Sequence, residues 1–221
     1  RQDEFLSGRG PDVGITRTYN SQGNFSDDNG DNWRQSMDRR IFGFTGTVNT
    51  AGSYVMRRGA DGAEVKYSWN GSAYVATDGA GSYDTLTYDG TNWTWTDGDS
   101  RVTEVYSAYG SEWRIASQTD TSGNSLTFSY TGANLTRVTT ADGGYTEINW
   151  SGSNIYALYT YSHGTGLTRT RYSYDGYNRL STVTVDLTPN DTTIGDGNVY
   201  TTSYTYHGTS KLVATISQTD G

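Results

Sequence analysis

The chain has 221 residues and a net charge of −8 at pH 7, a balance that excludes broad binding to nucleic acid phosphates. It has no Cys and only two His, which excludes a disulfide framework, a thiolate metal site and the common zinc sites. No apolar run approaches the roughly 18 residues of a membrane helix, so we expect no membrane insertion. Aromatic residues make up 14% of the chain, which indicates a folded protein and argues against disorder.

Residues 1–65 precede the clearest repeats, and we expect them to form an N-terminal β cap or plug. The best helical candidate in the chain is Asn32 to Ile41, where Trp33, Met37 and Ile41 share one face at helical spacing. That segment is short and its flanks are rich in Gly, so helix has little support. The sequence therefore predicts an all-β fold.

The same region holds a stretch rich in oxygen ligands, with Asp27, Asn29, Asp31 and Asp38 at suggestive spacing. An EF-hand loop needs Gly at its sixth position and Glu at its twelfth, whereas Asn32 and Asp38 stand there. The sequence therefore favours a solvated acidic loop, with a looser calcium site as the alternative. It predicts no other metal and no cofactor.

A short motif recurs seven times in residues 66–221. Each copy is an alternating run that ends in an aromatic residue, followed by one spacer and a Gly. The glycines are Gly71, Gly90, Gly110, Gly132, Gly152, Gly176 and Gly208. The period is thus about 20 residues until two insertions lengthen it. Since strand side chains alternate and Gly tolerates positive φ, each copy predicts a β-hairpin. Successive hairpins are expected to pair into a continuous, curved or spiralling antiparallel sheet.

The strand after the turn shows a second pattern, in which two apolar residues lie three positions apart. The pairs are Leu135 and Val138, Ile155 and Leu158, Leu180 and Val183, and Val213 and Ile216. Strict alternation cannot place both members of such a pair on one face of a strand. We therefore predict a β-bulge or a switch of face between them.

One copy, Tyr172 to Val183, resembles the YD repeat of the RHS family, whose consensus runs Tyr-Asp, a short turn, Arg-Leu and a Val three positions later. Tyr204 to Ile216 is similar, with Lys211-Leu212 in place of Arg-Leu. The resemblance covers roughly residues 14 to 221 and is strongest from residue 126. The motif residues are Tyr88, Asp89, Gly90, Tyr130, Gly132, Trp150, Gly152, Tyr174, Asp175, Gly176, Arg179, Leu180, Tyr206 and Gly208.

The resemblance implies that the chain is part of a spiralling shell from a secreted or surface-exposed bacterial protein. Such shells enclose or deliver a C-terminal, toxin-like domain, and the partners are then the remaining repeats and that domain of the same polypeptide. The self-cleaving Asp segment of such proteins has no match in this chain. As a fragment of a longer array, the chain is expected to expose an open sheet edge and to self-associate through it.

Enzymatic function has little support in the sequence. Many of the Asp residues stand beside Gly in turn signals, such as Asp61-Gly62, Asp97-Gly98 and Asp196-Gly197. Turn chemistry explains these carboxylates without catalysis, and the chain has no nucleophile elbow. We therefore predict a non-catalytic structural scaffold.

The rival hypothesis is a cell-surface adhesin or carbohydrate-binding module on the same β scaffold, with a glycan or protein partner. Trp93 and Trp95 project from one face of a strand, and Trp69 and Tyr88 lie in neighbouring copies. An exposed row of these rings suits stacking on sugars, whereas buried rings fill the interior. The aromatic period runs through every copy, so the sequence favours the interior. Burial of the rings separates the two hypotheses.

Overall fold

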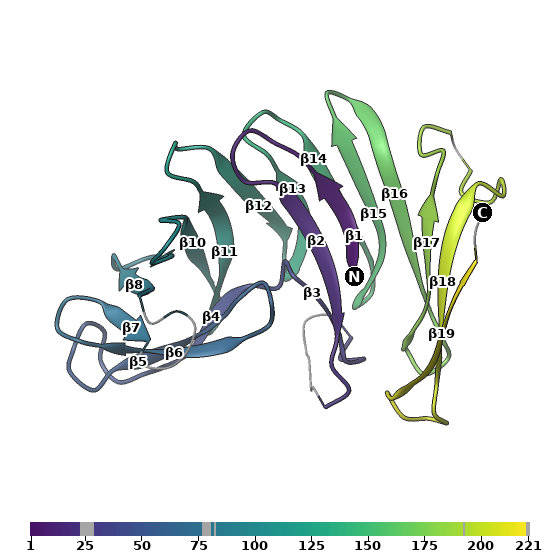
Figure 1. The fold of residues 1–221 in the computed structure, drawn as a ribbon. Coiled ribbons are helices and arrows are strands. Elements are labelled where there is room, and N and C mark those ends of the chain that lie inside the picture. Colours follow the sequence, from purple (N-terminus) through teal and green to yellow (C-terminus); the bar gives the residue numbers. More distant parts are fainter. Residues whose placement is uncertain (23–28, 77–80, 82, 192, 220–221) are drawn as a thin grey trace.

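The structure, a computed structural model, describes every residue except 23–28, 77–80, 82, 192 and 220–221 (Figure 1). Every helix or strand element among the described residues is a β-strand, and all the strand pairings are antiparallel, so the all-β prediction is confirmed. The segment Asn32 to Ile41, the best helical candidate in the sequence, contains one short strand, a turn and the start of the next strand.

The strands form two sheets. The smaller has the order β1-β2-β3, with β1 at Gln2–Leu6, β2 at Val13–Tyr19 and β3 at Trp33–Gln35. The larger has sixteen strands in the described part of the chain. Its first eight are β4 (Arg40–Thr45), β5 (Tyr54–Arg58), β6 (Glu64–Trp69), β7 (Tyr74–Ala76), β8 (Thr85–Tyr88), β9 (Trp93–Thr96), β10 (Thr103–Tyr109) and β11 (Glu112–Thr119). The others are β12 (Ser125–Thr131), β13 (Asn134–Thr139), β14 (Tyr145–Ser151), β15 (Asn154–Ser162), β16 (Thr165–Tyr174), β17 (Leu180–Asp186), β18 (Val199–Tyr206) and β19 (Val213–Thr219).

Strands β4 to β11 close into an eight-stranded barrel, visible at the left of Figure 1. One edge of β11 pairs with β10 along its whole length. Its other edge pairs first with β4, through Trp113 and Arg114, and then with β12, beginning at Ser117. The predicted antiparallel sheet is present, but in this part of the chain it closes into a barrel, because β11 pairs with β10 and β4 as well as with β12.

Large aromatic side chains fill the barrel. Trp93 is fully buried, and its ring centroid lies 5.0 Å from that of Tyr74 and 6.0 Å from that of Trp113. An eight-stranded barrel has an interior about wide enough for side chains to fill, which these rings do.

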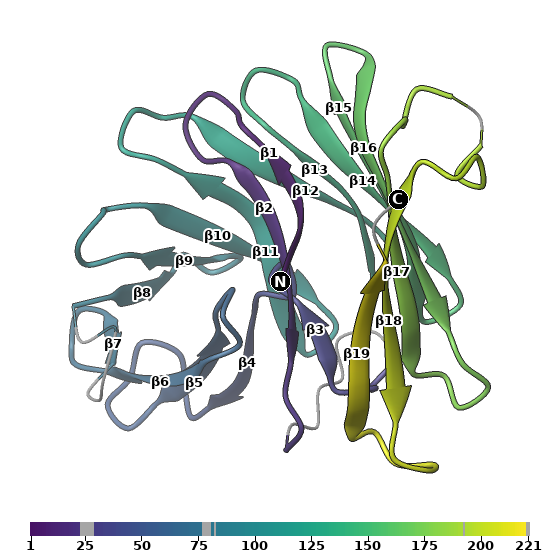
Figure 2. The same ribbon diagram turned by 45° about the vertical axis from the view of Figure 1, so that its right-hand side comes forward.

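Strands β12 to β19 continue from the barrel as an open sheet that curves around the small sheet (Figure 2). We call the small sheet, β1 to β3, the cap; β1 contacts β15 and β16 on the concave face of the open sheet. The predicted boundary at residue 65 lies inside β6, and β4 and β5 already belong to the large sheet.

Each of the seven predicted turn glycines lies between two strands that pair with each other. Six of the seven have positive φ, for example 59° at Gly132 and 62° at Gly152. Gly176 is the exception, because its longer turn places the positive φ, 61°, at Asn178. That turn is closed by Asp175, whose carboxylate accepts hydrogen bonds from the backbone N–H and side chain of Arg179.

Arg179 also ties this turn to the next hairpin, since its guanidinium donates to the carbonyl of Gly208 at 2.8 Å. Burial raises the pKa of Asp175, but the hydrogen bonds from Arg179 outweigh it, so the net pKa is lowered and the carboxylate stays charged. The turn of this repeat copy is therefore stabilised by the ion pair between Asp175 and Arg179.

The predicted bulges are present. Tyr130 pairs with Leu135 and Ser129 pairs with Arg137, which leaves Thr136 as the extra residue. The same register shift leaves Tyr156, Ser181 and Ala214 as extra residues in the next three hairpins. Both apolar residues are buried in the first three of these hairpins. In the last, Val213 is half-buried and Ile216 is 61% exposed.

A second regularity connects the hairpins. In the last four hairpins, the aromatic residue before the turn donates a side-chain hydrogen bond to a backbone carbonyl of the preceding hairpin. We call this series the aromatic ladder: Tyr130 to Ile115 O (3.0 Å), Trp150 to Leu135 O (2.8 Å), Tyr174 to Ile155 O (2.9 Å) and Tyr206 to Leu180 O (2.6 Å). Each acceptor directly precedes the extra residue of a bulge.

The ladder predicts that Tyr174→Phe destabilises the protein by about 1–2 kcal/mol, because the buried Ile155 carbonyl loses its donor while the ring stays in place. Urea unfolding measures the change. Tyr177→Phe is the matched control, since Tyr177 is 63% exposed, and it should change stability by less than about 0.5 kcal/mol. Equal effects of the two variants would contradict the role of the ladder.

Candidate functional site

The rings proposed for glycan binding lie in the barrel core. Trp93 and Trp95 are buried, and Trp69 and Tyr88 are half-buried and packed against the same core. The indole of Trp95 donates to the Tyr67 hydroxyl at 3.1 Å. They therefore do not form the exposed row that sugar stacking requires, and their burial favours packing.

The calcium candidates are used for contacts within the protein. Asp27 lies outside the described residues. Asp31 is buried and accepts the backbone N–H of Trp33 at 3.0 Å and that of Leu180 at 2.8 Å. The side chain of Asn29 donates to the carbonyl of Asn178 at 3.0 Å. This stretch thus joins the cap to the turn between β16 and β17.

Asp38 also has protein partners: it pairs with Arg40 and, at 3.0 Å, with Arg58. In the described part of the chain, no group of three or more His, Cys, Asp or Glu side chains is placed to hold a metal ion. Asp31 and Asp38 therefore act in this structure as acceptors for backbone amides and guanidinium groups.

The cap binds the concave face through buried charges. Arg17 on β2 is 1% exposed, donates to the Tyr204 hydroxyl at 2.9 Å and lies 5.0 Å from the centroid of the Trp33 ring. The carboxylate of Asp3 lies 3.5 Å from the same guanidinium and accepts the Tyr172 hydroxyl at 2.7 Å. Residues far apart in the sequence are thus held together by polar groups as well as by apolar packing.

A second carboxylate of the cap, Glu4, is buried against threonine side chains. It accepts the hydroxyl of Thr160 at 2.8 Å and that of Thr168. Burial is the largest influence on Glu4 and raises its pKa, although these hydrogen bonds lower it in part. Burial also raises the pKa of Asp3, against the lowering effect of Arg17. The interface therefore raises the pKa of both acids above the usual value.

Another charged cluster lies inside the barrel. Glu104 is 3% exposed and pairs with Arg39 at 2.5 Å and Arg57 at 2.7 Å, and it also accepts the Tyr106 hydroxyl. Burial alone raises the pKa of Glu104, but the two guanidinium groups outweigh it and the net pKa is lowered. The guanidinium of Arg57 also lies 3.7 Å from the Trp95 ring centroid. Because Arg39 immediately precedes β4, this cluster ties the segment between the cap and β4 to the barrel interior.

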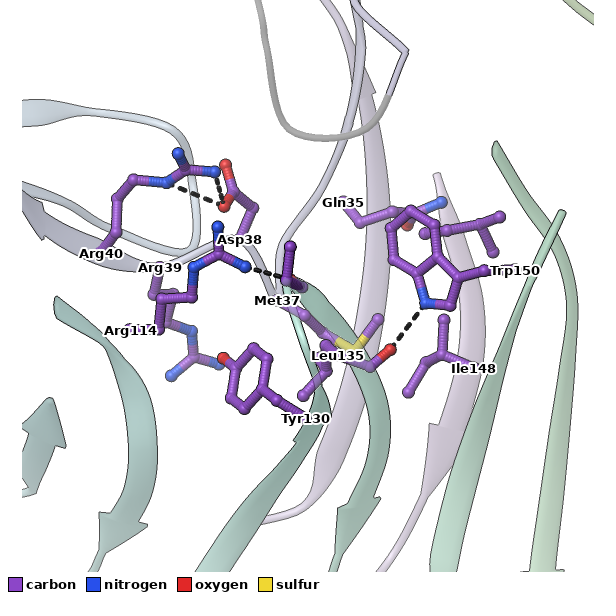
Figure 3. Close-up of a pocket in the computed structure, with 12 residues that line it drawn as sticks. Gln35, Met37, Asp38, Arg39, Arg40, Arg114, Tyr130, Leu135, Ile148 and Trp150 are labelled. Carbon is purple, nitrogen blue, oxygen red and sulfur yellow. Dashed lines mark hydrogen bonds and ion pairs between the residues drawn. The ribbon is translucent and has the colours of Figure 1, made fainter. Parts of the chain in front are cut away.

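A small cavity lies where the segment between cap and barrel crosses the open sheet (Figure 3). Met37 and Trp150 line it, and in Figure 3 the Trp150 indole points to the Leu135 carbonyl. Its volume is about 50 Å³, far below the roughly 300–1,000 Å³ of small-molecule sites. It has room for one or a few water molecules and not for a metabolite.

No family model matches the chain, and no curated protein is significantly similar to it. In the described part of the chain, no helix is long and apolar enough to cross a membrane. The function must therefore be inferred from the fold and its internal contacts.

The Glu104 cluster predicts that Glu104→Gln lowers stability at pH 7 by about 3–5 kcal/mol, because two buried guanidinium groups lose their counter-charge. Since the folded pKa is lowered from 4.5, the stabilisation is complete above that value and is lost as the pH falls through the folded pKa. Urea unfolding at several pH values measures it. The control is Glu147→Gln, which removes the half-exposed pair with Arg137 and should change stability by at most about 1 kcal/mol. Losses of equal size would refute the prediction.

The raised pKa of Glu4 predicts that its contribution to stability has the opposite pH dependence. Its pKa is raised from 4.5 in the folded state, so its effect on stability is most favourable below 4.5 and declines as the pH rises through the folded pKa. Glu4→Gln removes the charge and keeps an acceptor for Thr160, so the variant should lose less stability than the wild type as the pH rises above 4.5. Thermal unfolding across that range tests this, with the exposed Glu64→Gln as control. A parallel decline in wild type and Glu4→Gln would contradict it.

Proposed function

We propose that this protein is a non-catalytic structural scaffold, a set of β-hairpins resembling RHS/YD repeats. In this proposal it forms part of a spiralling shell that encloses or delivers a C-terminal, toxin-like domain of a secreted or surface bacterial protein. Its partners are then further repeats and that domain.

The aromatic ladder is the observation that carries the proposal. The same kind of hydrogen bond recurs at the same position in four successive hairpins, and each bond ties one hairpin to the hairpin before it. Stability that comes from contacts between neighbouring units is typical of repeat scaffolds. The Asp175–Arg179 pair, whose guanidinium reaches the next turn, adds a contact of the same kind at the copy closest to the YD consensus.

The cap supports a plug-like role for the N-terminal segment. It occupies the concave face of the open sheet, where Arg17 and Glu4 are buried among side chains of the hairpins. The barrel closes the other side of the sheet, since β10 pairs with both β9 and β11. In the proposed shell, this end of the sheet is therefore filled by the cap and closed by the barrel.

The adhesin or carbohydrate-binding alternative is less well supported. It requires an exposed row formed by Trp69, Tyr88, Trp93 and Trp95, and these rings pack in or against the barrel core.

The proposal predicts the content of the reading frame that encodes this chain. Sequencing on both sides should find, after residue 221, further copies of the aromatic-spacer-Gly motif, followed by a self-cleaving Asp segment and an unrelated C-terminal domain. Further copies that lead into wall-anchoring or calcium-binding adhesin modules would favour the binding alternative. A frame with no further copies would overturn the proposal.

A further inference from the structure

Strand β19 differs from the other second strands of the open sheet in having one described pairing partner, β18. In the preceding hairpins, the carbonyl before the bulge accepts a hydrogen bond from the aromatic residue of the next hairpin. The equivalent carbonyl in the last hairpin is that of Val213, and no aromatic donor from the described residues reaches it. The edge of β19 therefore carries an unused acceptor position of the aromatic ladder.

The exposure of apolar side chains also distinguishes the β19 edge from the preceding hairpins. The second residue of the apolar pair is 1% exposed at Val138, 0% at Leu158 and 3% at Val183, but 61% exposed at Ile216. Leu212, next to this strand, is 46% exposed. The repeat pattern thus places an apolar side chain where the other hairpins bury theirs, and nothing in the described chain covers it.

A groove of about 410 Å³ lies beside this edge, between the cap and β18–β19. Its lining includes Tyr19, Trp33, Tyr204 and Ile216. The Tyr19 hydroxyl donates to the carbonyl of Lys211 at 2.9 Å and accepts the N–H of Val213 at 3.1 Å. The cap therefore holds the beginning of β19 in place, so that the edge is preorganised for a partner.

We infer that the free edge of β19 binds an added antiparallel strand with the pattern Leu or Thr-x-apolar-x-Tyr or Trp. Leu126 to Tyr130 in β12 has this pattern, and its first position is Thr in the three strands that lie opposite Val138, Leu158 and Val183. The terminal aromatic donates to the Val213 carbonyl, and the first residue of the pattern lies opposite Ile216. The inference rests on the proposed function, because a further hairpin of the array is the partner that supplies such a strand.

The register of the added strand follows from the four existing junctions. In each, the residue three positions before the aromatic pairs with the residue two positions after the acceptor carbonyl. The pairs are Thr127 with Ser117, Glu147 with Arg137, Arg171 with Ala157, and Ser203 with Thr182. The incoming residue three positions before its aromatic therefore pairs with Thr215. A second copy of β19 lacks an aromatic residue and cannot supply the donor.

The test uses the whole chain and a synthetic peptide with the sequence of Asn124 to Thr131. We expect saturable binding and slower amide hydrogen exchange along β19 when the peptide is added. Replacing the peptide's Tyr by Phe should weaken binding about three- to tenfold, since it removes the hydroxyl donor alone. A scrambled peptide should not bind.

Two variants of the chain provide matched controls. Ile216→Lys places a charge on the face that the peptide covers and should abolish binding, and the exposed position of Ile216 lets the fold tolerate it. Ser217→Lys adds the same charge to the neighbouring, opposite face of β19 and should leave binding intact. Circular dichroism confirms that both variants are folded.

No peptide binding, equal binding to the two variants, or no change in exchange at β19 would overturn the inference. Protection of β19 in dimers of the chain alone, seen by sedimentation and exchange, would make a second copy the occupant and would also overturn it. These outcomes are separate from the reading-frame test. Further repeats without peptide binding would leave the scaffold standing, whereas peptide binding without further repeats would make β19 a docking site in a protein of another kind.

Discussion

The hydrogen bond from an aromatic side chain to the carbonyl that precedes a bulge is the constraint on which the open sheet depends. The bulge brings both apolar residues of a hairpin to the concave face. Pairing between neighbouring hairpins stops three residues before the aromatic, for example at Arg137 and Glu147. The backbone of Leu135 would then lack a partner near the core, and the Trp150 indole supplies one. The Trp150 side chain thus packs in the core and also supplies a hydrogen bond that strand pairing does not provide at this position.

Bulges also increase the local twist of a sheet, and their repetition at equivalent positions bends β12 to β19 around the cap. The concave face is polar toward one end of the strands, where Thr146 and Thr160 are fully buried and hydrogen-bonded to each other. Glu4 of the cap extends this polar row. A buried polar contact of this kind contributes less to stability than to register, because a shifted cap would leave the Glu4 carboxylate without donors.

The local pattern predicted the local structure well. Alternation, the turn glycines and the apolar pairs identified the hairpins and their bulges, because these depend on residues close in sequence. Closure of the barrel could not be predicted, since β4 joins β11 through two residue pairs that are some 70 positions apart in the chain. The role of Asp31 was also missed: a turn-like acidic residue accepts the N–H of Leu180, a contact that depends on how the cap docks. Thr146 could have been placed inward, because it alternates with Ile148 and Trp150.

The two ends of the large sheet differ in whether their backbone hydrogen-bonding groups are paired. A sheet edge exposes unpaired backbone groups, and barrels remove that liability by closure. In this chain the β4 side of the sheet is closed through β11, and its interior is sealed by Trp93 and the Glu104 cluster. The β19 side keeps the geometry of an internal junction, with an acceptor carbonyl at Val213 and an apolar side chain at Ile216. In the proposed array, growth of the sheet is therefore directional, because among the described strands only the β19 side has the geometry that each hairpin offers to the next.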